Sequence, residues 1–326
     1  MEKERYNHLN KYLKEKFGER TLKICIDANF TCPNRDGKVG VGGCIFCSEK
    51  GSGDHLKPLT NQHSTSFENP SNCSKNIGFI TSSIKSQIQN HLNSYRGERA
   101  NKFIAYFQNF TNTYDSLENL KARYDAALID DRIVLLAIAT RPDCITEDIC
   151  KLIASYKNRV EVWVELGLQT SNDETGNLIN RGYLSKQFSD AVKLLNKYEI
   201  DIITHIMVGL PNETFEDIKN TVNFINSHNI QGLKIHSCYV LKNTVLAQMY
   251  QNGSYSPITL DYYLEAAAYI LTHINPNIII HKISGDAPKD LLLAPDWNSH
   301  KKWIMNGLDK LLAEKNLHQG MYYNQY

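Results

Sequence analysis

Six short apolar runs alternate along the chain with longer stretches of helical period, and this alternation limits the possible folds more than any other feature. The runs are rich in β-branched and aromatic residues, and they cover residues 23–30, 102–110, 132–141, 160–170, 201–210 and 232–241. Between the runs, apolar residues recur at helical spacing, as at Ile80, Ile84, Ile88 and Leu92. The pattern predicts six repeated βα units around a parallel sheet, with one apolar stripe of each helix packed on it.

The same pattern predicts one domain with an addition at each end. Residues 1–22 form an N-terminal helix, and residues 23–241 hold the six units of an open barrel. Residues 242–326 follow as an α/β extension that caps the barrel. The extension contains a helix, a strand and a helix, near residues 260–273, 277–284 and 298–315. No linker rich in Pro, Gly and Ser divides the chain, so we expect a single α/β domain.

Composition and charge exclude several classes of protein. No apolar run reaches the roughly 18 residues that a membrane-spanning helix needs, and the N-terminus is too polar for a secretory signal. We therefore expect a cytoplasmic protein without membrane contact. In that reducing compartment the eight cysteines are thiols or metal ligands rather than disulfides. The net charge of +1 excludes a global basic field of the kind that would itself indicate a nucleic-acid-binding protein.

Three cysteines lie in one glycine-rich segment directly after the first expected strand. Residues 31–47 read TCPNRDGKVGVGGCIFC and contain Cys32, Cys44 and Cys47. The carboxyl ends of barrel strands are where such folds place their working residues. The four glycines of this segment let the backbone wrap closely around a compact object. We expect the whole loop, residues 31–56, to hold a metal centre.

The spacing of these cysteines leaves two kinds of metal centre open. Three thiolates bind zinc if a fourth ligand joins them, and His55, His63 and Cys73 lie downstream to supply one. On a [4Fe-4S] cluster, three thiolates instead leave one iron without a protein ligand. The position at the mouth of a βα barrel favours the cluster, because cofactor chemistry is normally placed there. The other cysteines have no compact ligand spacing and are expected to be inert thiols: Cys25, Cys73, Cys144, Cys150 and Cys238.

Several motifs resemble those of one family. The cysteine loop has the wide first gap seen in the catalytic subunit of elongator, and Phe46 is the aromatic residue before the last cysteine. The further segments similar to elongator or to its wider superfamily read ATRPD at 139–143, ELGLQT at 165–170, NRG at 180–182 and HIMVGLP at 205–211. Over residues 23–240 the chain therefore resembles the radical S-adenosylmethionine (SAM) superfamily, and within it the bacterial group related to the elongator catalytic subunit.

The resemblance implies a partial (β/α)6 barrel of the TIM type, with a [4Fe-4S] cluster on the three loop cysteines and SAM as the second cofactor. SAM bound at the open iron is cleaved reductively to a 5′-deoxyadenosyl radical, which abstracts hydrogen from the substrate. The residues expected at the cofactors are Phe46, Gln108, Arg141, Glu165, Gln169, Arg181 and His205. The residues expected at the substrate are Lys234, His236, Tyr239 and Asp286.

Elementary chemistry adds to three of these assignments. Glu165 and Gln169 are an even number of residues apart on one strand and so face the same side of it. A buried Glu165 needs a partner, which is a ribose hydroxyl, a cation or Arg181. Arg181 offers the forked contact that a carboxylate such as that of SAM accepts.

The resemblance also implies a substrate and partners. Because elongator acts on the wobble uridine of transfer RNA, the C5 side chain of that uridine is the favoured substrate, with tRNA as the partner. An electron donor such as flavodoxin or ferredoxin is implied as well. Two alternatives stay open at this point, a radical SAM enzyme that acts on a small carboxylated metabolite and a non-catalytic zinc-stabilised nucleic-acid-binding protein.

Overall fold

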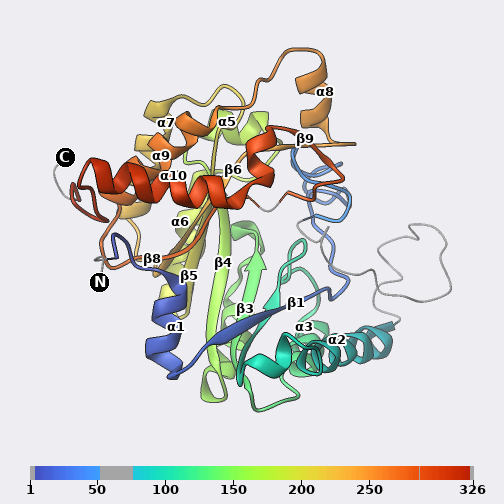
Figure 1. Cartoon of the computed structure of the whole chain (residues 1–326). Helices are drawn as coiled ribbons and strands as arrows, with labels where there is room; N and C mark the ends of the chain where they lie inside the picture. The colour runs from blue at the N-terminus through green and yellow to red at the C-terminus, as the bar shows by residue number, and fades with distance from the viewer. Residues whose placement is uncertain (1–3, 52–75, 286, 324–326) are drawn as a thin grey trace.

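Seven parallel strands form one curled sheet in the computed structural model, which describes residues 4–51, 76–285 and 287–323 (Figure 1). The strands are β1 (Thr21–Ile26), β2 (Lys102–Phe107), β3 (Ile133–Thr140), β4 (Glu161–Gln169), β5 (Asp201–Val208), β6 (Gly232–Ser237) and β8 (Ile279–Ile283). They follow one another across the sheet in sequence order, so that β1 and β8 are its two edges. The expected barrel-like α/β fold is confirmed.

The last strand of the sheet departs from the expected division of the chain. Sequence analysis placed a strand near residues 277–284 in the C-terminal extension, whereas β8 pairs in parallel with β6 and continues the barrel wall. The pairing runs from Gly232 beside Ile279 to Ile235 beside Ile283. Gly232 allows this close approach, since a Cβ there would lie 2.6 Å from Nε2 of His281. The wall therefore has a seventh strand in addition to the six repeated units.

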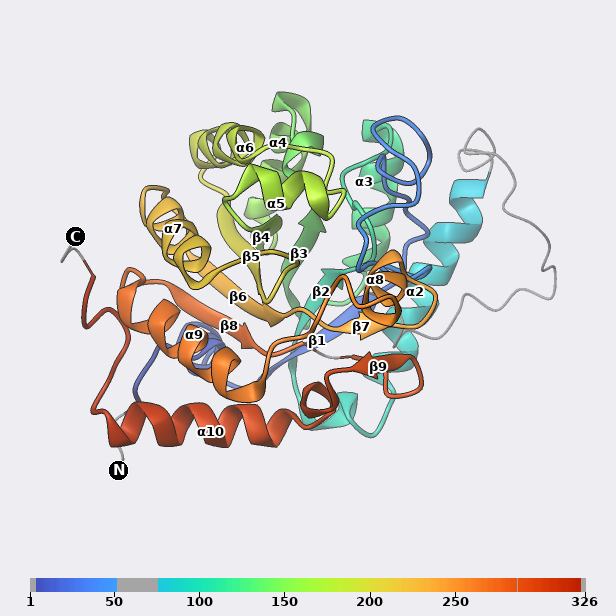
Figure 2. The ribbon, with the colours of Figure 1, turned by 90° about the horizontal axis from the view of Figure 1, so that it is seen from above.

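Helices cover the outer face of the sheet (Figure 2). Alternate strand residues such as Phe103, Ala105 and Phe107 point outward into the largest hydrophobic core, where they meet the apolar stripes of the helices. Side-chain caps fix several helix starts, as where Thr214 accepts a hydrogen bond from the backbone N–H of Asp217. The helices between the first six strands are α2 (Ile77–Leu92), α3 (Leu117–Ala127), α4 (Glu147–Ala154), α5 (Asp173–Leu178), α6 (Ser185–Lys197) and α7 (Phe215–Asn226).

The N-terminal helix α1 (Leu9–Phe17) closes the other face of the sheet at one end. It contacts both edge strands, β1 and β8. Leu9 and Leu13 are buried there in a second core with inward-facing strand residues, among them Trp163. The helix ends at Gly18, whose φ of 79° is the left-handed conformation that glycine adopts at low cost. Helix α1 thus packs between the two edge strands at the amino-terminal end, and the open interior runs from beside α1 to the carboxyl ends of the strands.

The C-terminal part packs around the barrel and against the cysteine loop. Its elements are β7 (Val240–Leu241), α8 (Val245–Gln251), α9 (Leu260–His273), β9 (Leu292–Ala294) and α10 (Lys301–Glu314). Helix α10 packs on α9, while Ile45 of the cysteine loop shares a small hydrophobic core with Val240 and Leu246. No helix in the part of the chain that the structure describes is long and apolar enough to span a bilayer.

The packing of α1 against the inner face of the sheet leads to a prediction about stability. Leu13 is buried against the inner face of the sheet, so Leu13→Ala should leave a cavity and lower the free energy of unfolding by about 2–5 kcal/mol. Lys11→Ala on the exposed side of the same helix should change it by about 0.5 kcal/mol or less. Denaturant unfolding measures both variants. Equal stability of the two would mean that α1 does not seal the barrel.

Candidate functional site

A cavity of about 1250 Å³ occupies the barrel interior and extends to the cysteine loop. Ordinary small-molecule sites measure about 300–1000 Å³, so this one has room for more than one ligand. Its walls come from alternate residues of the strands, since one face of every strand points inward. Pairs two residues apart line it on neighbouring strands: Lys23 and Cys25, Tyr106 and Gln108, Glu165 and Gly167, His205 and Met207, and Lys234 and His236.

The three loop cysteines line the same cavity as free thiols. The loop contains no helix or strand between β1 and residue 51, and turns shape it instead. Arg35 N–H donates to the carbonyl of Cys32, and Cys47 N–H donates to the carbonyl of Cys44 over 2.9 Å. The thiols of Cys32, Cys44 and Cys47 are therefore brought together at the carboxyl end of the sheet, as the sequence predicted.

The chemistry of these thiols fits a cluster. No group of three His, Cys, Asp or Glu side chains in the described ranges is arranged to hold one metal ion. A four-iron cube sets its cysteine ligands farther apart than one zinc ion does. Burial, followed by the charge of Cys47, raises the pKa of Cys44 to about 12, so its thiolate needs a cationic centre for stability. The expected zinc ligands His55, His63 and Cys73 lie outside the described residues.

Asn180 ties the cysteine loop to the turn between α5 and α6. Its side-chain amide donates to the carbonyl of Gly43 over 2.7 Å, next to Cys44. In return, the amide of Asn34 in the loop donates to the carbonyl of Asn180 over 2.6 Å and lies 3.9 Å from the Cys44 sulfur. Gly182 permits this contact, because a Cβ there would come within 2.8 Å of the Asn34 side chain. The turn thereby fixes the position of Cys44, one of the three expected cluster ligands.

The loop is also braced from within by Arg35. Its guanidinium donates to the carbonyls of Cys47, Ser48 and Glu49. A Cβ at Gly43 would lie 2.9 Å from the Arg35 side chain, so the glycine lets the guanidinium cross the loop. Arg35 therefore holds the segment after the third cysteine, while Asn180 holds the segment before the second.

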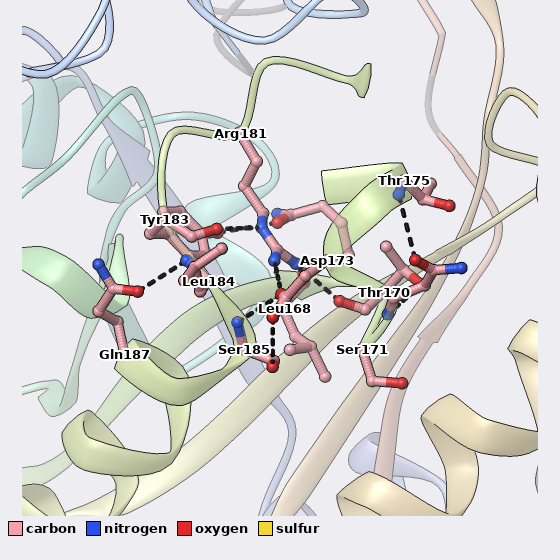
Figure 3. A network of polar contacts seen from close by, with 12 residues as sticks. Leu168, Thr170, Ser171, Asp173, Thr175, Arg181, Tyr183, Leu184, Ser185 and Gln187 are labelled. Atoms are coloured by element: carbon pink, nitrogen blue, oxygen red, sulfur yellow. Dashed lines mark hydrogen bonds and ion pairs between the residues drawn. The ribbon is translucent and has the colours of Figure 1, made fainter. Parts of the chain in front are cut away.

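Arg181 occupies a different place from the one expected (Figure 3). Its side chain is fully buried and is not part of the cavity wall. The guanidinium donates to the carbonyls of Leu168, Thr170 and Tyr183 and forms an ion pair of 2.9 Å with Asp173. All three guanidinium nitrogens are thus engaged within the protein. The expected forked contact with the SAM carboxylate is corrected: Arg181 locks the α5–α6 turn onto the end of β4.

Gln169 is positioned at that same strand end. Its φ of 61° turns the backbone out of the strand, and the Tyr183 hydroxyl donates to its side-chain carbonyl over 2.8 Å. Gly167 makes room, since a Cβ there would lie 2.6 Å from the Gln169 amide. Glu165 and Gln169 both line the cavity, which confirms that they face one side of β4.

Glu165 is the centre of a buried charged network. One carboxylate oxygen, Oε2, accepts hydrogen bonds from Tyr106 at 2.7 Å and His205 at 2.8 Å and also pairs with Lys234. Lys234 donates to the Tyr106 hydroxyl as well, over 3.1 Å. The second oxygen, Oε1, is buried and has no partner among the described residues. The partner that the sequence required for Glu165 is therefore a cation, Lys234, and not Arg181.

Burial and mutual attraction set the charges of this network. Burial acts to raise the pKa of Glu165, but Lys234 and His205 outweigh it and hold the pKa well below 4.5. Burial lowers the pKa of Lys234 to about 7 against the attraction of Glu165. Burial, and then the charge of Lys234, lower the pKa of His205 to about 4. The carboxylate is thus ionised and His205 is a neutral donor at physiological pH.

Apart from Arg181, all the expected site residues that the structure describes line the same cavity. The cavity wall contains Phe46, Gln108, Arg141, Glu165, Gln169, His205, Lys234, His236 and Tyr239. Arg141 faces it while held in a forked pair with Asp143, and His236 presents a buried Nε2 that has no partner in the described part of the chain. Asp286 lies outside the described residues.

Sequence analysis missed several residues of the cavity wall. Tyr106 lies two residues before Gln108 on β2, so the strand period was a signal for it. Cys25, expected to be an inert thiol, lines the cavity for the same reason. His281 and Lys282 were missed because their strand was assigned to the extension. The positioning role of Asn180 had no signal beyond the NRG motif itself.

Comparison with known proteins relates this geometry to a family. The family model described as Radical SAM superfamily matches residues 32–225, and the Radical_SAM C-terminal domain matches residues 230–314. The chain is 35% identical to the protein YtqA of Bacillus subtilis over 321 residues, which are 98% of this chain and 94% of that protein.

Two further proteins are similar over shorter ranges. The tRNA uridine(34) acetyltransferase of Dehalococcoides mccartyi is 30% identical over 177 residues, which are 53% of this chain and 37% of that protein. The solved structure of Elp3 from the archaeon Methanocaldococcus infernus matches with a TM-score of 0.60 and 20% identity, over 73% of this chain and 60% of that one. At 20% identity, the match to the Elp3 structure shows a shared fold alone.

The contact between Asn180 and the loop generates a prediction about metal retention. Asn180 has a φ of 53°, so Asn180→Gly removes the amide without straining the backbone. We expect the variant to lose iron several times faster than the native protein, because Gly43 and Cys44 are no longer held. Asn316→Gly, at a φ of 48° beyond α10, is the matched control. Iron content after timed chelation measures both, and equal retention would contradict a positioning role.

The buried network generates a prediction about protonation. Lys234→Met removes the ammonium that depresses the pKa of His205 and leaves Glu165 to raise it. We expect the His205 pKa to rise by at least one unit from about 4, and the free energy of unfolding to fall by about 3–5 kcal/mol. Histidine NMR titration and denaturant unfolding measure the two effects. Lys193→Met on the exposed face of α6 is the control, and an unchanged His205 pKa in Lys234→Met would refute the coupling.

Proposed function

The chain belongs to the radical SAM superfamily, whose members carry a [4Fe-4S] cluster and SAM, and from this premise we propose that it modifies the C5 side chain of a tRNA wobble uridine. That the chain is a radical SAM enzyme rests on the family match over more than half of its length. The choice of a tRNA uridine as the substrate rests on further observations.

Cys32, Cys44 and Cys47 are the residues that would hold the cluster, because their free thiols share one cavity and one braced loop. With SAM bound, the cluster supplies the electron that generates a 5′-deoxyadenosyl radical. Phe46, beside the last cysteine, and Gln169, at the end of β4, line the adjoining wall and would orient SAM. The radical SAM reaction also needs an electron donor, and a flavodoxin or ferredoxin is the class that we propose.

The inner network would act on the substrate rather than on the cluster. The unpartnered Oε1 of Glu165 accepts a hydrogen bond from an N–H or O–H group that enters the barrel. The nearby Nε2 of His236 is a second unpartnered polar atom in the described part of the cavity wall. Burial and the charge of Lys282 hold the pKa of His236 well below 6.5, so this ring is neutral. Together these atoms would orient a polar heterocycle for hydrogen abstraction.

The observation that carries the tRNA proposal is the 30% identity to a tRNA uridine(34) acetyltransferase over about half of the chain. The motifs shared with the elongator group lie in the cysteine loop, at the ends of strands that line the cavity, and in the α5–α6 turn that braces the loop. Acetyl transfer is not part of the proposal, because the match covers 37% of that protein. Uridine modification by a radical at the side chain is what the shared part would support.

One observation favours a second candidate, a small carboxylated metabolite as the substrate. Lys23 and Lys282 line the interior of the cavity, and Glu165 is the single carboxylate among the described residues of its wall. Ammonium groups in such a site bind a carboxylate well. The two candidates differ in whether activity requires a macromolecule.

Anaerobic reconstitution tests the proposed function. The reconstituted protein is incubated with SAM and dithionite, with and without bulk tRNA, and both 5′-deoxyadenosine and the nucleosides of the tRNA are analysed by mass spectrometry. We expect 5′-deoxyadenosine to form and one uridine-derived nucleoside to change mass, while Cys47→Ala forms neither product. If no nucleoside changes mass although the cluster is intact and SAM is cleaved, tRNA is rejected as the substrate. The small carboxylated metabolite then remains as the candidate.

A further inference from the structure

Positive charge is concentrated in the cavity although the chain as a whole is nearly neutral. Nine lysine and arginine side chains line the cavity, against one carboxylate among the described residues, whereas the net charge of the chain is only +1. The single acid, Glu165, is already paired with Lys234. Arg141 is likewise paired with Asp143, which lies outside the wall, so the exposed cations of the wall supply the positive field that an entering ligand meets.

Four of these cations form an exposed group, which we call the basic rim. They are Lys14 on α1, Arg20 before β1, Arg96 after α2 and Lys301 at the start of α10. Elements far apart in the sequence supply them, and Figure 1 shows α1, β1 and α10 on the same side of the molecule. In the described ranges none of the four forms an ion pair. The nearby acids Glu15 and Glu19 are not part of the cavity wall.

The arrangement of charge and aromatic rings indicates the kind of partner. Several exposed cations along an opening bind a chain of phosphates better than one small anion, because each neutralises a separate charge. An aromatic ring deeper in the same cavity, that of Tyr239, is of the kind on which a base can stack. A duplex buries its bases, so chemistry on a base requires a single-stranded or extruded nucleotide.

The geometry points to the basic rim as the binding site for the phosphates of a single-stranded RNA segment, which delivers one nucleotide into the cavity. This inference rests on the proposed function, since it specifies how the RNA reaches the site. The rim residues position the RNA backbone and take no part in the chemistry. The interior residues then recognise the base.

A fourfold variant tests the inference. Lys14→Gln, Arg20→Gln, Arg96→Gln and Lys301→Gln are combined, and binding of an RNA hairpin with an unpaired loop is titrated at several salt concentrations. We expect affinity to fall at least tenfold, and the slope of log K against log salt to fall by about 0.7 for each phosphate that the variant no longer neutralises. A blunt RNA duplex of equal length should bind the native protein more weakly than the hairpin does.

The matched control removes the same charge from exposed helix positions outside the cavity. It replaces by glutamine four lysines on α2, α4, α6 and α10: Lys85, Lys151, Lys193 and Lys310. Arg20→Lys combined with Arg96→Lys keeps the charge and should keep most of the affinity. Thermal unfolding followed by circular dichroism verifies that every variant is folded. An equal fall in affinity in the rim variant and the control, or no fall in either, would overturn the inference.

The outcomes separate this inference from the proposed function. If RNA binds through the rim but no nucleoside changes mass, the rim stands and the wobble-uridine assignment fails. If a nucleoside is modified equally well by the rim variant, the function stands and the rim inference fails. A native protein that binds the hairpin no better than the duplex would also reject the rim as a single-strand site.

Discussion

The hydrogen bonds between the cysteine loop and the turn after α5 hold together the parts on which the site depends. The loop has no regular secondary structure of its own, so its shape comes from contacts with its surroundings. Asn180 fixes the backbone beside Cys44, and the adjacent Arg181 fixes the same turn to the end of β4. The thiols therefore keep a constant position relative to the strand that carries Glu165 and Gln169. One short motif thus couples the cluster ligands to the barrel interior.

The interior itself is organised by charge. Glu165 is a buried carboxylate that is stable because Lys234, His205 and Tyr106 all donate to one of its oxygens. The other oxygen is buried and has no partner in the described part of the chain. Around this carboxylate the wall is cationic, which suits an anionic substrate, and the basic rim extends that preference to the opening. In our proposal, recognition at the rim and orientation at Glu165 are separate tasks carried out by separate residues.

Much of the fold was predictable because strand and helix periods are local properties of the sequence. The six strands, the place of the cysteine loop directly after the first of them and the shared inward face of Glu165 and Gln169 on β4 followed from spacing. The place of β8 did not, since pairing of β8 with β6 depends on contacts between residues about fifty apart. Arg181 was assigned to SAM because an arginine in a motif suggests a ligand, whereas its surroundings of four protein acceptors became visible only in three dimensions.

The central claim is that three thiolates leave one iron open to SAM. Electron–nuclear double resonance on the reduced, reconstituted protein tests it most directly, with SAM that carries ¹⁵N at its amino group. A ¹⁵N hyperfine coupling large enough for a direct bond to iron is the predicted result. An iron-containing protein that shows no such coupling with SAM bound, or a protein that retains stoichiometric zinc in place of iron, would contradict the claim.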